Sequence, residues 1–599
     1  MSTYDDASLI YYPSGYKESK AYSLKPTDGS GDLTFTRAST ATRVNEQGLI
    51  EGVRTNLLTY SEQFDNAAWV KNNSSVTANV TTAPNGTTTA DKLIPNATAS
   101  VNKYIRQVPS ATNGLIYSLT VFAKAAEYDM LRIEDGNNSR GAWFNLSLGT
   151  VGSVSLDVST NIEALENGWY KCTISKLSAA SSVFFLIGGS NTESVQVGDG
   201  TSGIYIWGAM LEQSVQATEY IPTTTTAVSV GMLANVPRID YTGGGCGKLL
   251  LEPQRSNLIT YSEQIDNAGW TKGNAPTITT NIATAPDGTV SADGIQSVTG
   301  GAFRTIAQNF SVSANSTVTG SVFIKKETSE TAFGGLGIVF QGGTTKTCYT
   351  IFNAVTGTGL ISGSSLTGTI KVDDYGNYWR LQVTTTDNGS NTTLGFTYYG
   401  TISANGVSIN TGAGSVRTVW GFQVEIGASY ATSYIPTTTT AVTRTQDSAS
   451  KENIAGTLPT AYPFTLFAEC EVTPASEGQA LTFSNTASST EYFTIDNSGG
   501  FYRIVSRPST IQSTAVSTLD TTLGFHKICG VFTSTTLKLF VDGTLVASGA
   551  NAQAFNASIN DIFIGQLRSV SDTGNRNPVK QALVFKSALS DAQAIELTA

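Results

Sequence analysis

The sequence has few of the residues that build most catalytic and metal sites. Its 599 residues include a single histidine and only 14% charged side chains. One histidine allows a Ser-His-Asp triad once at most, and it excludes any site that needs two or three His ligands from one chain. That residue, His526, lies at the start of an apparent strand, where a structural role is favoured. We therefore expect a protein with no catalytic residues that is not an enzyme.

Cysteine is also scarce, and its placement favours neither disulfides nor metal binding. The five cysteines are Cys172, Cys246, Cys348, Cys470 and Cys529. They are odd in number, spread over the chain and without CxxC spacing, so we expect isolated thiols in or near the core, as in a protein made in a reducing cytoplasm. No loop has EF-hand spacing and no GxxxxGK[ST] motif follows a strand. The sequence predicts no metal and no cofactor.

Positive charge is the third shortage. The chain has 36 basic and 46 acidic residues, a formal net charge of −10, and no stripe of Lys and Arg that could bind phosphates. The acidic N-terminus lacks the features of a signal peptide, and no run of 18 apolar residues occurs. We expect no nucleic-acid partner, no membrane insertion and no export by the signal-peptide route.

Threonine and glycine are abundant instead, with 58 glycines and 40% hydrophobic residues. β-branched residues favour strands, and Asp-Gly, Asn-Gly and Gly-Gly pairs mark tight turns between short alternating segments. At roughly 100 to 200 residues per domain, this length predicts about three to five domains. The fold class we predict is all-β, with tandem β-sandwich (jelly-roll) domains.

An internal repeat defines the organisation. Residues 54–71 and 255–272 are identical at 13 of 18 positions, and YIPTTTTAV recurs at 220–228 and 434–442. The ends of the two copies are alike while the middle differs, so we expect the first and last strands to pair and close each module. The middle, being free to change, is where two copies could acquire different ligands.

The repeat divides the chain into five parts. We predict an N-terminal attachment segment (1–53), a first carbohydrate-binding-like sandwich (54–229), a connecting segment (230–254), a second sandwich (255–443) and a different C-terminal domain (444–599). The tyrosine-rich N-terminal segment has an alternative interpretation, a strand packed on the first sandwich. In the connecting segment, the glycines from Gly243 predict a turn followed by an apolar strand.

The C-terminal part has its own strand pattern. It includes HKICGVFTSTTLKLFVDGTLV, with Asp542-Gly543 as a hairpin turn, then IFIGQ, a final strand and KSALSDAQAIEL, in which Ser590 can cap a short helix. This order resembles the laminin-G or concanavalin A-like lectin superfamily, a jelly-roll sandwich. The resemblance covers about 150 residues.

Three long phrases resemble tailed-bacteriophage virion proteins. They are DLTFTRASTATRVNEQGLIE (32–51), VPRIDYTGGGCGKLLLEPQRSNLITYSEQIDNAGW (236–270) and WGFQVEIGASYATSYIPTTTTAVTRTQDS (420–448). The family they resemble is described as head spike, head fibre or tail fibre proteins, which implies a virion appendage made in the host cytoplasm. The implied partners are other copies of the chain, as a homotrimer or dimer, other virion proteins of capsid or tail, and host-cell surface glycans. No coiled-coil or collagen-like shaft is visible, so globular domains are expected.

Sugar-binding sandwiches use aromatic rings that stack on pyranoses. Trp143, Tyr398 and Tyr399 lie in the diverged middle of the two repeats, among polar residues, and are our candidate carbohydrate-binding residues, with core packing as the alternative. Four tryptophans are instead retained in equivalent positions of both copies, which favours a framework role. They are Trp69, Trp270, Trp207 and Trp420.

Two other functions remain open. A polysaccharide-degrading enzyme with binding modules would need a pair of carboxylates. Asp373 with Asp374, which precede an apparent turn, and Glu469 with Glu471, on one strand, are adjacent acids without a second signal, so a solvated or structural role is favoured. A bacterial surface adhesin built from the same sandwiches is the other alternative.

Overall fold

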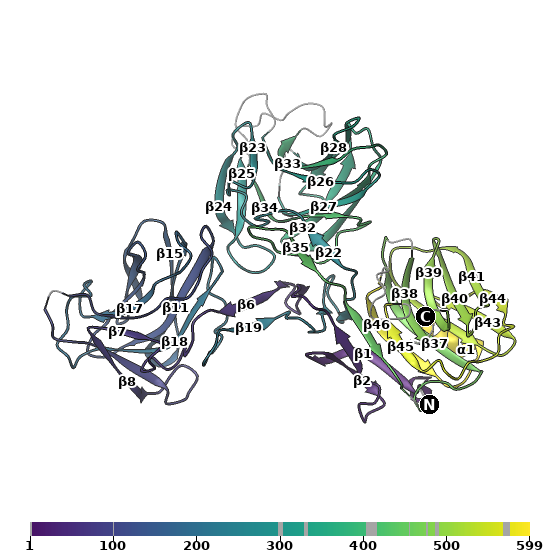
Figure 1. Ribbon diagram of the computed structural model, residues 1–599, viewed down its shortest axis with the longest axis horizontal. Helices are drawn as coiled ribbons and strands as arrows, with labels where there is room; N and C mark the ends of the chain where they lie inside the picture. The colour runs from purple at the N-terminus through teal and green to yellow at the C-terminus, as the bar shows by residue number, and fades with distance from the viewer. Residues whose placement is uncertain are drawn as a thin grey trace. The chain divides into compact units, whose positions relative to one another are not determined.

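The computed structural model describes residues 3–99, 101–296, 304–328, 333–402, 416–454, 456–474, 477–485, 490–566 and 576–599. The chain is all-β and consists of β-sandwich domains, as predicted (Figure 1). It divides into two compact units, Val53–Gly231 and Met1–Gly52 with Met232–Ala599. Across the described ranges, no helix is long and apolar enough to cross a bilayer.

The first unit is one sandwich, here called the first repeat. One sheet has the order β14 (Thr150–Val154), β13 (Arg140–Asn145), β12 (Met130–Asp135), β17 (Phe185–Ser190), β10 (Tyr104–Gln107) and β7 (Val70–Asn72). The other has the order β15 (Val158–Ala164), β16 (Trp169–Leu177), β11 (Ile116–Ala125), β18 (Ile204–Glu212), β9 (Ala90–Pro95) and β8 (Ser74–Thr81), with η2 (Glu166–Gly168) before β16. β12, β13 and β14 follow one another in the first sheet and β15 and β16 in the second, so the chain passes from sheet to sheet several times.

The second repeat has the same strand order within the larger unit. One sheet runs β23 (Thr271–Gly273), β26 (Thr305–Ser311), β33 (Thr393–Ile402), β28 (Phe333–Gln341), β29 (Lys346–Asn353) and β30 (Thr358–Ile361). The other runs β24 (Thr277–Ala283), β25 (Ala292–Gln296), β34 (Val416–Ile426), β27 (Thr317–Lys325), β32 (Tyr378–Thr386) and β31 (Gly368–Tyr375). Each strand of the first repeat therefore has a counterpart in the second.

Both repeats are closed by pairing of their ends, as the sequence predicted. In the first, β6 (Val53–Asn56) pairs with β19 (Val228–Gly231), and in the second, β22 (Arg255–Asn257) pairs with β35 (Val442–Arg444). A fully buried asparagine ends each opening strand. Asn56 donates to the carbonyls of Ala209 and Ile221. Asn257 donates to the carbonyls of Phe422 and Ile435 in the same way. The same buried hydrogen bonds therefore stabilise the end of the opening strand in both repeats.

The four tryptophans retained in both copies are core residues, which confirms the predicted framework role. Their side chains are between 0% and 5% exposed. The indole N–H of Trp69 donates to the carbonyl of Tyr60 at 3.0 Å, and that of Trp270 donates to Tyr261 at the same distance. Trp69 and Trp270 make the same buried hydrogen bond in the two repeats, which explains why tryptophan is retained at this position.

The C-terminal sandwich is built on one long path of strands. From one edge it runs through β41 (Ser513–Asp520), β40 (Phe501–Arg507), β39 (Tyr492–Ser498), β38 (Glu477–Ser484), β45 (Asp561–Ile564) and β36 (Ser448–Lys451). It continues through β3 (Leu33–Thr36), β2 (Lys20–Lys25), β1 (Leu9–Lys17), β46 (Val579–Phe585), β37 (Phe464–Val472), β42 (Gly524–Phe532), β43 (Thr536–Val541) and β44 (Thr544–Ala550). Residues from both ends of the chain thus form one sheet (Figure 1).

The N-terminal segment, predicted to be an attachment segment, is part of this domain. After η1 (Thr3–Asp6), strand β1 pairs with β46, and β3 pairs with β36. Leu9, Tyr11 and Phe35 are fully buried in the same core as Phe464. The stretch therefore has a structural role here, while its role in attachment stays a prediction.

Two short hairpins come from the segments that precede the repeats. β4 (Arg43–Val44) pairs with β5 (Ile50–Glu51), and its Val44 and Ile50 pack against Trp420 and Tyr434 of the second repeat. β20 (Ile239–Asp240) pairs with β21 (Lys248–Leu249) around the predicted glycine turn, and β21 also pairs with β46.

Three arginines meet in the larger unit, in what we call the arginine joint: Arg37, Arg238 and Arg444 with Glu252 and Asp447. Arg37 Nη1 lies 3.1 Å from Asp447 Oδ1, and Arg238 Nη1 lies 2.8 Å from Glu252 Oε2. All five side chains are at most 6% exposed. Burial lowers the pKa of Arg37 to about 10. Burial alone would raise the pKa of Glu252, but Arg444 and Arg238 hold it well below its usual value.

The remaining local predictions have mixed outcomes. α1 (Asp591–Thr598) begins with a capping box at Ser590, and the Asp542-Gly543 turn has positive φ at both residues, as expected. Asp373 and Asp374 lie near the end of β31, just before the turn that joins it to β32, as expected. Four cysteines are buried free thiols, whereas Cys246 is exposed in the glycine turn and departs from the predicted near-core position.

Candidate functional site

The outer face of one sheet in the second repeat carries the candidate site. Along β33, Leu394, Phe396 and Tyr398 are fully buried and point into the sandwich. Because side chains alternate along a strand, Thr397 and Tyr399 point to the other face, and both are only partly buried. The outward residues of β33, β28 and β29 therefore form a surface of their own.

Two tyrosines meet on this face, here called the tyrosine pair. The rings of Tyr349 on β29 and Tyr399 on β33 have centroids 5.9 Å apart and are nearly perpendicular, at 87°. Gly337 lies on β28 between the two strands. A Cβ atom there would lie 2.8 Å from Tyr399 Cε2 and 3.0 Å from Tyr349 Cδ1, so only glycine lets both rings approach the backbone.

The hydroxyl groups of the pair are hydrogen-bonded to each other. Burial is the largest cause that raises the pKa of Tyr399, and the neighbouring Tyr349 raises it further. A protonated phenol can donate to a ligand oxygen as well as accept. The pair therefore offers both ring surface and polar groups.

Polar side chains surround the pair at positions set by strand register. Thr397 and Tyr349 flank Gly337 on the two neighbouring strands, and Asn309 on β26 faces Gly395. Asn309 is exposed. Threonine hydroxyls and an asparagine amide can donate to and accept from ligand hydroxyls. The arrangement suits a small polyhydroxylated ligand.

The equivalent face of the first repeat is filled by its own side chains. Arg132 on β12 faces Trp143 on β13 and Gly188 on β17, as Gly335 faces Tyr399 on β33. The register that starts from the equivalent residues Gln107 and Gln308 makes Arg132 the counterpart of Gly335, and Glu134 the counterpart of Gly337.

The Trp143 ring is covered. The Arg132 guanidinium lies 5.6 Å from the ring centroid, and Glu134 Oε2 holds it at 3.0 Å. Trp143 is only 6% exposed. A segment that includes Val195 also crosses this face, since a Cβ at Gly188 would lie 2.9 Å from Val195 Cγ1. A sugar ring could not reach Trp143 without moving these groups.

The three predicted residues therefore have three different environments. Tyr399 is on the outer face, Trp143 lies on an outer face beneath Arg132, and Tyr398 is fully buried in the core of the second repeat. The structure brings none of the three together as one ligand surface. Sequence reasoning missed Tyr349 and Gly337. The signal was the stretch GGLGIVF (334–340), where glycines alternate with the apolar residues of the inner face.

The adjacent acids and the histidine have structural partners. Asp374 pairs with Lys326 at 2.7 Å, and Glu471 pairs with Lys248 at 2.7 Å. His526 Nδ1 lies 2.6 Å from Asp542 Oδ2, beside the hairpin turn. Among the residues that the structure describes, no group of three or more His, Cys, Asp or Glu side chains could hold a metal ion.

Comparison with known proteins identifies one domain. Residues 443–594 match the family model described as "Concanavalin A-like lectin/glucanases superfamily". The C-terminal sandwich is accordingly a laminin-G/concanavalin A-like lectin domain, which confirms that part of the resemblance. The match begins within β35, the closing strand of the second repeat, and covers no other strand of the repeats. No curated protein sequence matches the chain.

Several solved structures are distantly similar. The CBM40 of the Ruminococcus gnavus IT-sialidase is 13% identical over 24% of this chain and 84% of its own, with a TM-score of 0.22. The CBM22-1–CBM22-2 tandem of Paenibacillus barcinonensis Xyn10C is 10% identical over 62% and 97%, with a TM-score of 0.19. Domains LG4-5 of the mouse laminin α1 chain are 12% identical over 53% and 96%, with a TM-score of 0.18.

Proposed function

We propose that the chain is an adhesive virion appendage, a head fibre, head spike or tail fibre, and that its second repeat binds host-surface glycans through the tyrosine pair. The observation that carries the glycan-binding proposal is the pair itself, two partly buried rings on an outer sheet face over Gly337. Aromatic rings beside a few polar groups are the usual composition of a sugar site.

The lectin domain supports a binding role for the chain as a whole. A protein with one lectin domain and two sandwich repeats has several surfaces for weak contacts. Many identical copies on one particle convert weak contacts into firm attachment, because each further contact is made at high effective concentration. Association into a trimer or dimer, and docking on capsid or tail proteins, belong to this proposal.

The virion part of the proposal rests on the three phage-like phrases, and imaging tests it. Particles labelled with an antibody against the chain should show it at fixed positions on head or tail. Its detection instead on uninfected bacteria would favour the adhesin alternative.

The glycan-binding part is tested with the full chain and two variants. We expect Tyr399→Ala to weaken binding to an array of neutral oligosaccharides about 10-fold, the loss of one ring contact of about 1.4 kcal/mol. Tyr22→Ala is the matched control, because Tyr22 is an exposed tyrosine in β2 of the C-terminal sandwich. Equal binding by both variants would refute the assigned site, and release of oligosaccharides from polysaccharide would favour the enzyme alternative.

A further inference from the structure

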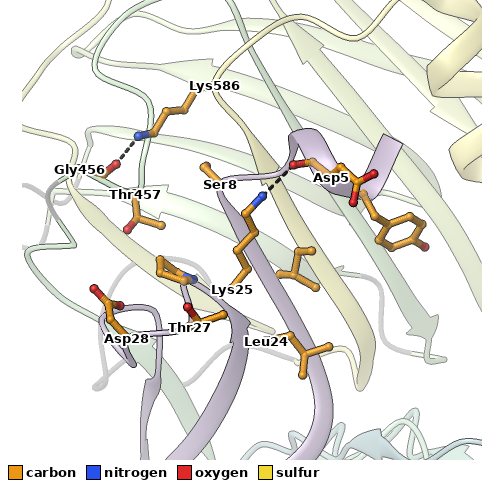
Figure 2. Close-up of a pocket in the computed structure, with 12 residues that line it drawn as sticks. Asp5, Ser8, Leu24, Lys25, Thr27, Asp28, Gly456, Thr457 and Lys586 are labelled. Atoms are coloured by element: carbon orange, nitrogen blue, oxygen red, sulfur yellow. Dashed lines mark hydrogen bonds between the residues drawn. The ribbon is translucent and has the colours of Figure 1, made fainter. Parts of the chain in front are cut away.

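A second surface in the larger unit has the features of a ligand site. A pocket with a volume of about 670 Å³ lies where β2 and η1 of the N-terminal segment meet the C-terminal sandwich (Figure 2). Tyr4, Leu24, Lys25, Asp28, Thr457 and Lys586 are among its lining residues. This volume is within the range of about 300–1,000 Å³ that is usual for small-molecule sites.

Two lysines give the pocket its polarity. Lys25 Nζ donates to the carbonyl of Asp5 at 2.8 Å, and Lys586 Nζ donates to the carbonyl of Gly456 (Figure 2). Within the described part of the chain, neither ammonium group forms an ion pair. Each ammonium has three N–H donors, so each has donors left for a ligand. Both lysines line the pocket together with Asp5 and Asp28.

The rest of the lining fits a sugar better than a simple anion. Tyr4 is 39% exposed and Leu24 is 51% exposed, so both offer apolar surface to a ring. Hydroxyl groups of Ser8, Thr27 and Thr457 also line the pocket. The Asp28 carboxylate, held by the backbone N–H and hydroxyl of Ser30, can accept from ligand hydroxyls. Donors, acceptors and apolar surface occur together.

We infer that this pocket binds a saccharide that bears a carboxylate, with Lys25 and Lys586 holding the carboxylate and Tyr4 contacting the ring. Charge-assisted hydrogen bonds from two ammonium groups supply the preference for an acidic sugar over a neutral one. The site is separate from the tyrosine pair, so it can exist whether or not the second repeat binds glycans.

The test compares D-glucuronate with D-glucose, which differ in the carboxylate. Binding to the full chain is followed by saturation-transfer NMR, and the same titration is repeated on Tyr399→Ala to exclude a contribution from the tyrosine pair. We expect glucuronate to bind at least 10-fold more tightly than glucose, with an affinity that falls as salt rises. Lys586→Gln should reduce glucuronate binding about 10-fold, whereas Lys17→Gln, an exposed lysine of β1, should not.

A second substitution guards against misfolding. Lys25→Gln removes the other ammonium group, and the unfolding midpoint of each variant shows whether the fold is intact. Equal binding of the two sugars, no saturable binding of glucuronate, or unchanged glucuronate binding in two folded lysine variants would overturn the inference. Loss of glucuronate binding in Tyr399→Ala alone would reassign it to the tyrosine pair.

Discussion

The two repeats have the same framework and differ on one face. Asn56 and Asn257 make the same hydrogen bonds, and Trp69 and Trp270 occupy the same core position. On the outer sheet face, however, β12 carries Arg132 and Glu134 where β28 carries Gly335 and Gly337. Two charged side chains therefore cover the face of the first repeat, where two glycines leave room for aromatic rings in the second.

The difference teaches where this fold tolerates change. Inner residues must fill a core whose shape is fixed by both sheets, so a substitution there leaves cavities or overlaps. Outer residues contact neighbours on one face of one sheet only, so fewer contacts restrict their size and shape. Arg132 contacts both Trp143 and Glu134 with one side chain, whereas Gly337 leaves space on the second repeat to two tyrosines. Five substitutions test this comparison.

The largest effect is expected from the shared asparagine. Asn257→Ala removes the partners of two buried carbonyls and two buried N–H groups, which should lower the free energy of unfolding by about 3 to 5 kcal/mol. Asn56→Ala should cost the first repeat a similar amount. Hydrogen exchange of each repeat measures both. A cost in one repeat alone would show that the frameworks are not equivalent.

Gly337→Arg should displace the tyrosine pair from the outer face of the second repeat. The side chain cannot fit beneath the tyrosine pair, so the rings must move, and oligosaccharide binding should fall at least 10-fold, about 1.4 kcal/mol. The unfolding midpoint, measured alongside, distinguishes displacement of the rings from unfolding. Undiminished binding would mean that the ligand does not contact the pair.

The response to pH should separate the repeats. Burial raises the pKa of Asp293 to about 7 and that of its counterpart Asp91 to about 6, from 3.8. When folding raises the pKa of a carboxyl group, the folded state binds its proton more tightly than the unfolded state does. The free energy of unfolding therefore falls as pH rises from the unfolded pKa to the folded pKa. The second repeat should therefore keep losing stability between about pH 6 and 7, when the contribution of Asp91 is complete.

One pKa unit corresponds to about 1.4 kcal/mol, and this is the expected difference between the two repeats in stability lost through Asp293 and Asp91. Hydrogen exchange in β25 and β9 across this range measures it. Asp293→Asn should reduce the slope of the second repeat's profile, and Glu263, whose pKa burial raises to about 8, accounts for the slope that remains. Parallel profiles in the unsubstituted protein would contradict the assigned burial.

The smallest effect is expected from Arg132→Ala. Loss of the cation over the Trp143 ring should destabilise the first repeat by about 0.5 to 1 kcal/mol. We expect no gain of oligosaccharide binding, because the segment that includes Val195 still crosses the face. Strong binding by this variant would show that Arg132 alone had closed the site.

The sequence predicted the fold class, the closing strands, the retained tryptophans and the C-terminal helix because each depends on local pattern or on comparison of the two copies. It did not predict which of two adjacent tyrosines faces outward, since the phase of alternation in β33 depends on which face the core covers. The sequence also did not predict that Arg132 covers the Trp143 ring, because the two residues are neighbours across a strand pair and not along the chain.

The pairing of the N-terminal strands was beyond local pattern altogether. β1 pairs with β46, more than 560 residues later. Nothing in residues 9–17 specifies so distant a partner, and the strand alternation there fits packing on any sandwich.

This pairing has a consequence for synthesis. The first repeat can fold as soon as residue 231 has left the ribosome, because its closing strands lie within it. Strands β1 to β3 must wait, with apolar side chains unsatisfied, until the last strand of the chain is made. At about 5 to 20 residues per second, that delay is roughly half a minute to two minutes. During that time the first-made part of the protein is the last to be finished, and it is the part most open to pairing with the wrong strand.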